Sequence, residues 1–352
     1  MDILTVFGAG ATIYTALNFI PARSALMQDE IITETFKQLG IQNKDGLLPV
    51  QKKGVWYLPA GLSPKDIQKA IPALSYQFNA DVEMEVRGKA IMLNIYPGDL
   101  PTNIPYQHQD THKYKLGLPI GRTRKKDCYI FDLNDAHPYL IVAGAPGQGK
   151  SNALNVFLRS IAENYEPDYI QWHLVDLKYG AELGKFSEGD YADYCGGTCW
   201  DPKKDQQLIT MLSALQREIK RRMNAFRQAG VVKIDEYNVL PDVERLPYRL
   251  IVIDEYAELR RNGEAEERLQ SVIQTGRAAG IRCILCTQRP SATNLSTDIR
   301  GLIADRLCFR VPDRTNSEIV LDLPGAETLP CPGRCLLLHG ADVVEAQAMR
   351  AP

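Results

Sequence analysis

Residues 140–152, LIVAGAPGQGKSN, constrain the fold of this 352-residue chain more than any other stretch. A short apolar run passes there into a turn with the spacing G-x-x-x-x-G-K-[ST]. Glycines in this pattern let backbone N–H groups face phosphate oxygens, while the lysine reaches the β/γ-phosphates and the hydroxyl binds Mg²⁺. Residues 153–161 have helical character, so a helix N-terminus would face the anion. The stretch predicts a nucleotide site with phosphate ligands at Gly144, Ala145, Pro146, Gly147, Gln148, Gly149, Lys150, Ser151 and Asn152.

The net charge and the cysteine spacing argue against a protein with a basic surface throughout and against a metal site built on cysteines. The net charge of −2 excludes a basic surface over the whole protein, so any contacts with nucleic acid would be confined to a groove or pore. Cys283 and Cys286 lie three apart in an apolar, strand-like run and would face opposite sides, which argues against a shared metal. No nearby His or Cys completes a set of four ligands around the other two cysteine pairs, Cys195/Cys199 and Cys331/Cys335. Reduced thiols are expected.

Residues 1–23 contain a run, 3–20, that has no charged side chain and ends before Pro21 and Arg23. Its length is at the lower limit for a helix that spans a bilayer, and its threonines, glycines and Asn18 weaken that interpretation. We expect a membrane-anchor helix. The alternative is a helix packed on this protein or on a neighbour. A cleaved signal peptide is disfavoured because no basic segment precedes the run.

Residues 24–115 predict a small α+β domain followed by a linker. A strand is expected at 55–58, a helix within 61–78 with Ser63 as its N-cap, and two strands at 81–86 and 90–96. No catalytic cluster appears here, so a scaffold or oligomerisation role is expected. The polar segment 97–116 has no apolar periodicity and is interpreted as a linker. For the same reason His108 and His112 are not expected to bind a metal together.

Residues 116–352 predict a second domain with a parallel, doubly wound sheet, because strands and helices alternate after the glycine-rich turn. A hairpin is expected within 118–133. Further strands are expected at 169–176, 250–253, 281–287, 306–311 and 335–338, and helices at 208–228 and 269–279.

Ligands of open α/β sheets bind beyond the carboxyl ends of strands, so polar residues there are candidates for function. Asp254 and Glu255 directly follow the run LIVI. Asp254 would hold Mg²⁺ through water and Glu255 would polarise the attacking water. Gln288 ends the next strand, where it would sense the γ-phosphate and the lytic water. The alternative for Gln288 is a simple turn before Pro290.

A cationic side chain is still needed to neutralise the charge that develops on the transferred phosphoryl group. In ring ATPases a neighbouring subunit often supplies an arginine. Arg277 is the candidate, because it ends the helix before the Gln288 strand. Arg306, Arg310 and Arg314 compete with it, and each arginine has a surface salt bridge as its alternative.

Six motifs of this chain, and the order in which they occur, resemble those of the FtsK/SpoIIIE family of DNA translocases. They are GAPGQGKSN (144–152), DPKK (201–204), EIKRRMNAF (218–226), GVVKIDEYN (230–238), IVIDEYAEL (251–259) and RAAGIRCILCTQRPS (277–291). The resemblance covers about residues 118–345. A weaker one covers 50–100, where the sequence looks like the small domain ahead of the motor in mobile-element relatives.

The resemblance implies an α/β fold: a RecA-like P-loop NTPase core with a mainly parallel sheet, preceded by the small α+β domain. It also implies ATP and Mg²⁺ as cofactors and a homo-hexameric ring around double-stranded DNA. Lys150 and Ser151 match the phosphate and magnesium ligands, Asp254 and Glu255 the Walker B pair, Gln288 the sensor, and Arg277 the arginine offered between subunits. Lys203 and Lys204 resemble positions near the pore loops, and six copies of a few lysines would make a basic pore without a basic protein.

Two departures from the family pattern matter. Ser317-Glu318 stands where the family has a Ser-Arg pair, so no role carries over to an arginine there. The chain also ends soon after the last expected strand, without room for the winged-helix module of chromosomal members. Sequence-specific loading would then need another protein, such as a relaxase or a replication or loading protein of a mobile element.

The sequence therefore predicts ATP-driven translocation of double-stranded DNA in the transfer or maintenance of a plasmid, phage or integrative conjugative element. The ATPase domain would lie in the cytoplasm, anchored to the inner face of the cell membrane by residues 3–20 if that run is a membrane helix. One alternative is an ATPase similar to those of type VII secretion, which move protein. The other is a nucleotide-switched scaffold, against which the intact Lys150, Asp254, Glu255 and Gln288 argue.

Overall fold

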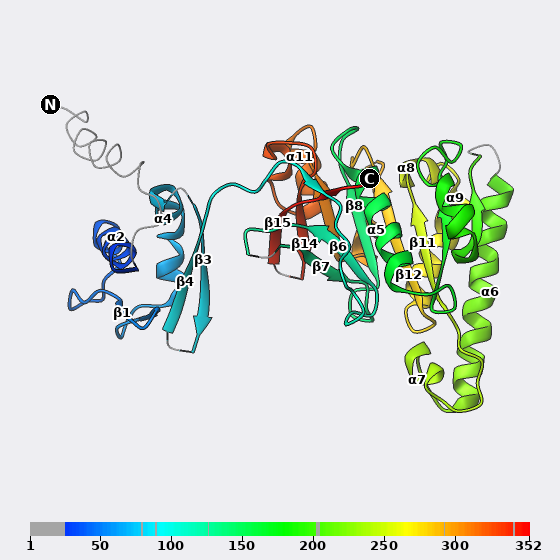
Figure 1. Ribbon diagram of the computed structural model, residues 1–352, viewed down its shortest axis with the longest axis horizontal. Helices are drawn as coiled ribbons and strands as arrows, with labels where there is room; N and C mark the ends of the chain where they lie inside the picture. Colours follow the sequence, from blue (N-terminus) through cyan, green and yellow to red (C-terminus); the bar gives the residue numbers. More distant parts are fainter. Residues whose placement is uncertain are drawn as a thin grey trace. The chain divides into compact units, whose positions relative to one another are not determined.

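The computed structural model describes residues 25–78, 80–88, 90–125, 127–201, 205–291, 293–340 and 342–352 (Figure 1). The chain divides into two compact units, Met1–Asp99 and Leu100–Pro352. The expected anchor, residues 3–20, lies outside the described residues. Within the described ranges, no helix is both long enough and apolar enough to cross a membrane.

The first unit is a four-stranded antiparallel sheet with helices, in the strand order β1-β2-β4-β3. Its core includes Phe36 and Trp56, whose rings meet edge to face at 5.4 Å. The expected strands are present, as is the hairpin of β3 and β4. The elements are α2 (Ala25–Gln38), β1 (Val50–Lys52), β2 (Val55–Tyr57), α3 (Pro64–Gln68), α4 (Ile71–Phe78), β3 (Ala80–Arg87) and β4 (Ala90–Pro97).

The helix expected within 61–78 is two helices in the structure. Ser63 is the N-cap of α3, and its backbone N–H donates to the Asp66 carboxylate at 3.0 Å. The chain then breaks before α4, whose second residue is Pro72. Proline has no N–H to continue a helix and its ring clashes with the preceding turn, so the helix must start again at this point.

The second unit is a three-layer α/β structure. Its elements are β5 (Ile104–Pro105), β6 (Gly117–Gly121), β7 (Tyr129–Asp132), β8 (Tyr139–Ala143), α5 (Lys150–Asn164), β9 (Ile170–Val175), β10 (Cys195–Cys199), α6 (Asp205–Ala229), α7 (Ile234–Asn238), β11 (Tyr248–Ile253), α8 (Tyr256–Leu259), α9 (Gly263–Gly276), β12 (Ile281–Thr287), α10 (Thr297–Leu302), β13 (Asp305–Phe309), α11 (Arg314–Leu321), β14 (Arg334–His339), β15 (Asp342–Gln347) and β16 (Met349–Arg350).

The central sheet has the order β10-β9-β11-β12-β8-β13-β14-β15. The six strands from β10 to β13 are parallel, while β14 and β15 are antiparallel additions at one side. The expected mainly parallel sheet is therefore confirmed. Because β8, β12, β11 and β9 are parallel neighbours, their carboxyl ends meet at one edge, which is where the polar candidates lie.

Both faces of this sheet are covered by helices (Figure 1). On one face α5 packs Phe157 and Ile161 against strand residues that include Trp172. On the other face α6 and α9 supply a second apolar cluster. Cys286 belongs to the first cluster and Cys283 to the second, which confirms that the two thiols point to opposite sides of β12.

The segment expected to be a linker lies largely within the second unit, which begins at Leu100 rather than after residue 115. β5 pairs with β16 at the end of the chain. The backbone N–H of Thr111 donates to the Asn164 side chain at 3.0 Å, and the Leu100 carbonyl accepts from Arg334 at 2.9 Å. Partners far away in the sequence thus order a segment that has no apolar periodicity of its own.

Candidate active site

The glycine-rich turn joins β8 to α5 and is fixed at its base by two neighbouring strands. The Gly144 N–H donates to the Thr287 carbonyl at 3.3 Å, and the Ala145 N–H to the Arg310 carbonyl at 2.9 Å. Gly149 has φ 121°, and a Cβ there would lie 3.2 Å from the Gly333 Cα, so glycine is required. The loop borders a pocket of about 280 Å³ lined by Ala145, Pro146, Gly147, Gly149, Lys150, Ser151, Asn152, Glu182 and Gln288.

Lys150 extends from the start of α5 to the end of β11. Its Nζ donates to the Asp254 carbonyl at 2.9 Å and also forms an ion pair with the Asp254 carboxylate. Both side chains are almost fully buried, with 3% and 0% of the side chain exposed. Burial acts to lower the pKa of Lys150, yet the net shift is upward because acidic groups, Asp254 among them, surround the ammonium. The structure thus brings two residues 104 positions apart into direct contact.

Lys178 adds a second cation to this cluster. It follows β9, and its Nζ lies 3.0 Å from Asp254 Oδ2 and 4.0 Å from Glu255 Oε2. Burial alone would raise the pKa of Asp254, but the ammonium groups of Lys150 and Lys178 outweigh it, so the net shift is downward. Asp254 is therefore ionised at neutral pH. Sequence reasoning assigned no role to Lys178, although its place just beyond a strand end was the available signal.

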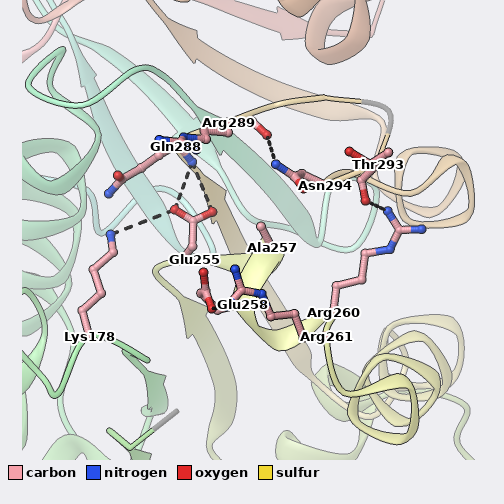
Figure 2. Close-up of a pocket in the computed structure, with 10 residues that line it drawn as sticks. All are labelled: Lys178, Glu255, Ala257, Glu258, Arg260, Arg261, Gln288, Arg289, Thr293 and Asn294. Atoms are coloured by element: carbon pink, nitrogen blue, oxygen red, sulfur yellow. Dashed lines mark hydrogen bonds and ion pairs between the residues drawn. The ribbon is translucent and has the colours of Figure 1, made fainter.

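Glu255 is held in a different environment from Asp254. The Thr287 hydroxyl donates to its carboxylate at 3.0 Å, and the Gln288 backbone N–H lies 3.3 and 3.2 Å from its two oxygens. Figure 2 shows Glu255 between Gln288 and Lys178. Burial raises the pKa of Glu255 above its usual value, although these contacts and nearby Lys150 oppose the shift. Two adjacent carboxylates with pKa values moved in opposite directions can divide metal binding and proton transfer between them.

Gln288 lines two adjoining pockets. One is the pocket at the glycine-rich turn. The other, about 650 Å³, is lined by Lys178, Glu255, Ala257, Glu258, Arg260, Arg261, Gln288, Arg289, Thr293 and Asn294 (Figure 2). Gln288 therefore lies between the phosphate-binding loop and the open side of Glu255.

Asn152 lines the first pocket, but its side-chain amide is engaged elsewhere. Nδ2 donates to the Met349 carbonyl at 2.7 Å, and Oδ1 accepts from the Ala351 N–H at 2.8 Å. Ser151, one residue earlier in α5, also lines the pocket. The amide of Asn152 thus joins α5 to the C-terminal strand, a contact the motif alone does not predict.

The four candidate arginines occupy different surroundings. Arg277 is exposed and precedes β12, so it lies at the sheet edge opposite the glycine-rich turn and cannot serve that turn in its own subunit. Arg306 is buried and bonded to the Val320 carbonyl and to Asp322, which agrees with the salt bridge that was its alternative.

Of the remaining cationic candidates, Arg310 is exposed and its carbonyl holds Ala145. Arg314 is exposed and pairs with Glu318, one turn along α11, at 2.7 Å. Lys203 and Lys204 lie outside the described residues.

Comparison with curated proteins finds relatives that are named DNA translocases. The DNA translocase FtsK of Chlorobaculum tepidum is 33% identical over 248 residues, which cover 67% of this chain and 30% of that protein. The DNA translocase SpoIIIE of Bacillus subtilis is 32% identical over 235 residues, which cover 64% of this chain and 29% of that protein. The chain thus spans about a third of the length of these relatives.

Solved structures share the fold. The conjugation coupling protein TcpA of pCW3, in a monomer form with ATPγS, has a TM-score of 0.65 at 24% identity, covering 92% of this chain and 95% of that one. The type VII secretion ATPase EccC of Thermomonospora curvata has a TM-score of 0.61 at 24% identity, covering 72% of this chain and 30% of that one. The FtsK/SpoIIIE family model matches residues 105–292, more than half of the chain. This chain therefore belongs to the FtsK/SpoIIIE family of P-loop ATPases.

Proposed function

We propose that this protein hydrolyses ATP to move double-stranded DNA through a ring of six copies of the chain. The observation that carries the proposal is the row of Lys150, Asp254, Glu255 and Gln288 at one sheet edge, since a scaffold without turnover does not need all four. Relatives at 32–33% identity that are named DNA translocases support DNA as the cargo.

The residues of the site fit a magnesium–ATP complex. Asp254 is an ionised carboxylate and Ser151 a hydroxyl at the mouth of the loop, and such hard oxygen ligands suit Mg²⁺. The ion would neutralise charge on the phosphates and on the reacting phosphoryl group. Lys150 must release Asp254 to reach the β/γ-phosphates. Glu255, with its raised pKa, accepts a proton from the attacking water more readily than an ordinary glutamate does.

We further propose that the site is completed between subunits. Arg277 is exposed and lies at the far edge of the sheet from its own loop, so it is free to face the nucleotide of a neighbour. Lys203 and Lys204 would face the DNA in the centre of the ring. A net charge of −2 is compatible with this, because the basic residues are needed only where they line the pore.

A mobile element is the proposed setting. The similarity to TcpA, which is named a conjugation coupling protein, extends over nearly the whole of both chains and includes the small unit. A relaxase or a replication or loading protein of that element would bring the DNA to the ring. Residues 3–20 would anchor the ATPase at the inner face of the membrane, and fractionation of full-length and 24–352 chains tests this. Recovery of both in the soluble fraction would contradict an anchor.

Protein is the second candidate cargo, favoured by the similar fold of EccC. The lower sequence identity of that structure, compared with the DNA translocases, makes this the weaker reading. A secreted protein substrate would then raise the rate of ATP hydrolysis and DNA would not.

The central experiment measures ATP hydrolysis by the full-length chain with and without linear duplex DNA. We expect DNA to raise turnover, and Lys150→Ala to lower it about 100-fold or more, the order of loss found when a donor that stabilises a transition state is removed. Lys44→Ala, which removes an exposed lysine of the small unit, is the matched control and should retain full activity. Turnover that does not respond to DNA would contradict the proposed cargo.

Mixing variants tests the arginine. Arg277→Ala and Lys150→Ala subunits are inactive separately if both residues are required. Mixed rings contain interfaces in which an intact Lys150 meets an intact Arg277, so part of the activity should return. No recovery in rings shown by native mass spectrometry to be mixed would contradict the assignment.

A further inference from the structure

Three ligand-type side chains converge at the sheet edge opposite the ATP site. His137 precedes β8, Asp305 is the first residue of β13, and His339 is the last residue of β14. Because β13 runs parallel to β8 and antiparallel to β14, these three positions fall at the same edge. The cluster belongs to no motif of the ATPase.

Both imidazoles point at the same carboxylate. Nδ1 of His137 lies 2.8 Å from Asp305 Oδ2, and Nδ1 of His339 lies 2.7 Å from Asp305 Oδ1. The two ring centroids are 4.2 Å apart. One ligand atom from each of the three residues lies within 4.8 Å of the other two. The Asp305 side chain is 3% exposed, whereas each histidine is 31% exposed, so an ion could enter from solvent past the rings.

The charge balance favours a cation. In the described ranges no lysine or arginine forms an ion pair with Asp305; its ion-pair partners there are the two imidazoles. Asp305 is 2% exposed and has no permanently charged cation beside it among the described residues, and burial of an uncompensated carboxylate is costly. A divalent ion held by all three side chains would supply the missing charge.

The ligand types select the class of metal. Two imidazole nitrogens and one carboxylate oxygen suit Zn²⁺, Co²⁺ or Ni²⁺, whereas Mg²⁺ prefers oxygen ligands. Ligand bonds of about 2.0–2.1 Å would require only a small opening of the present nitrogen-to-oxygen contacts. Phe131 packs edge-on against both imidazoles and so restrains their orientation. Its ring centroid lies 5.2 Å from that of His339 and 6.4 Å from that of His137.

We propose that His137, Asp305 and His339 form a binding site for a transition-metal ion of the Zn²⁺ class, with solvent completing the coordination. The ion would tie the antiparallel strand β14 to β8, the strand that leads into the glycine-rich turn. This site is separate from the ATP site and does not depend on which cargo the ATPase moves.

The test distinguishes a metal site from a carboxylate that is merely hydrogen-bonded. His137→Asn and His339→Asn keep an N–H donor near the position of Nδ1 but remove a strong metal ligand. Co²⁺ is titrated into the full-length chain with Mg²⁺ in excess, because its visible absorption separates nitrogen and oxygen ligands from thiolates. The matched control is His112→Asn, since His112 contacts Asp110 at 2.9 Å in a single exposed pair.

We expect one equivalent of Co²⁺, displaced by Zn²⁺, in the wild type and in His112→Asn. Loss of one histidine should weaken binding about 100-fold or more, beyond the 10- to 100-fold typical of an outer-shell change. The rise in Tm on adding Zn²⁺ should disappear in the same variants. Absence of one-equivalent binding in the wild type, or undiminished binding in His137→Asn and His339→Asn, would overturn the proposal.

A measurement on the wild type alone covers the case in which a variant fails to fold. Diethyl pyrocarbonate modifies accessible imidazoles, and mass spectrometry of peptides locates the modification. One equivalent of Zn²⁺ should protect His137 and His339 while His112 continues to react. Equal reaction of all three with and without Zn²⁺ would also overturn the proposal.

Discussion

Asn152→Ala distinguishes two roles for Asn152: binding the nucleotide phosphates, and joining α5 to the C-terminal strand. The change removes the bond to the Met349 carbonyl and the bond from the Ala351 N–H. A typical bond contributes about 1 kcal/mol, and more when a buried partner is left unpaired. Met349 is 3% exposed, so we expect a total loss of about 2–3 kcal/mol. For a unit of this size that corresponds to a fall in Tm of about 5–10 °C.

The assays are calorimetric melting and the KM for ATP. If the amide serves only to join α5 to the C-terminal strand, Tm falls while KM changes less than about twofold. Asn155→Ala is the matched control in the same helix: its Nδ2 bonds the Ser151 carbonyl and its buried Oδ1 has no partner in the described structure, so Tm should be unchanged or higher. An unchanged Tm together with a tenfold rise in KM would refute the reasoning.

Four further outcomes are expected. Glu255→Gln should slow hydrolysis about 10²–10⁴-fold, the usual contribution of a general base, with ATP binding retained in a filter assay; wild-type turnover would contradict the assignment. At a pH above the raised pKa of Glu255, the same change should raise Tm, because the ionised carboxylate costs stability there. At a pH below the pKa of an unfolded glutamate, the change should leave Tm unaltered, and a gain in Tm that persists at this pH would contradict the burial argument. Lys178→Met removes a cation that lowers the pKa of Glu255, so the acid limb of the pH–rate profile should move to higher pH; no movement would show that Lys178 does not act on Glu255. Gly121→Ala should cost about 2 kcal/mol or more in urea unfolding, because φ is 146° and the new Cβ would lie 2.1 Å from the Gln347 carbonyl oxygen; a cost below about 0.5 kcal/mol would refute this.

The parallel core was predictable because its signals are local. Apolar runs mark β8, β11 and β12, and the residues after them mark one edge of the sheet: the glycine-rich turn after β8, Asp254 after β11 and Gln288 after β12. Once the strands are known to be parallel neighbours, contact between Lys150 and Asp254 follows. The alternation of strands and helices also predicted the two helical layers.

β10 was missed because its sequence, CGGTC, argues against a strand. The structure explains the two glycines: a Cβ at Gly196 or Gly197 would lie 3.1 or 3.0 Å from the imidazole of His173. That ring is buried, its two nitrogens have no partner in the described structure, and burial lowers its pKa to about 4, so it packs as a neutral group. Only the neighbouring strand reveals why glycine is required.

Contacts between distant residues were the other part that the sequence could not supply. Lys178 reaches Asp254, Asn152 reaches the last strand, and His137 meets His339 only after the sheet has formed. None of these pairs has a spacing that a motif would encode.

The first residue of the second unit is connected by hydrogen bonds to the glycine-rich turn. The Gly333 N–H donates to the Gln148 carbonyl in the glycine-rich turn at 2.8 Å. Next to Gly333, the Arg334 guanidinium donates at 2.9 Å to the carbonyl of Leu100, the first residue of the second unit. Two consecutive residues, Gly333 and Arg334, therefore link the backbone of the glycine-rich turn to the residue at which the second unit begins, so a change in the turn would act on both ends of this short chain of hydrogen bonds.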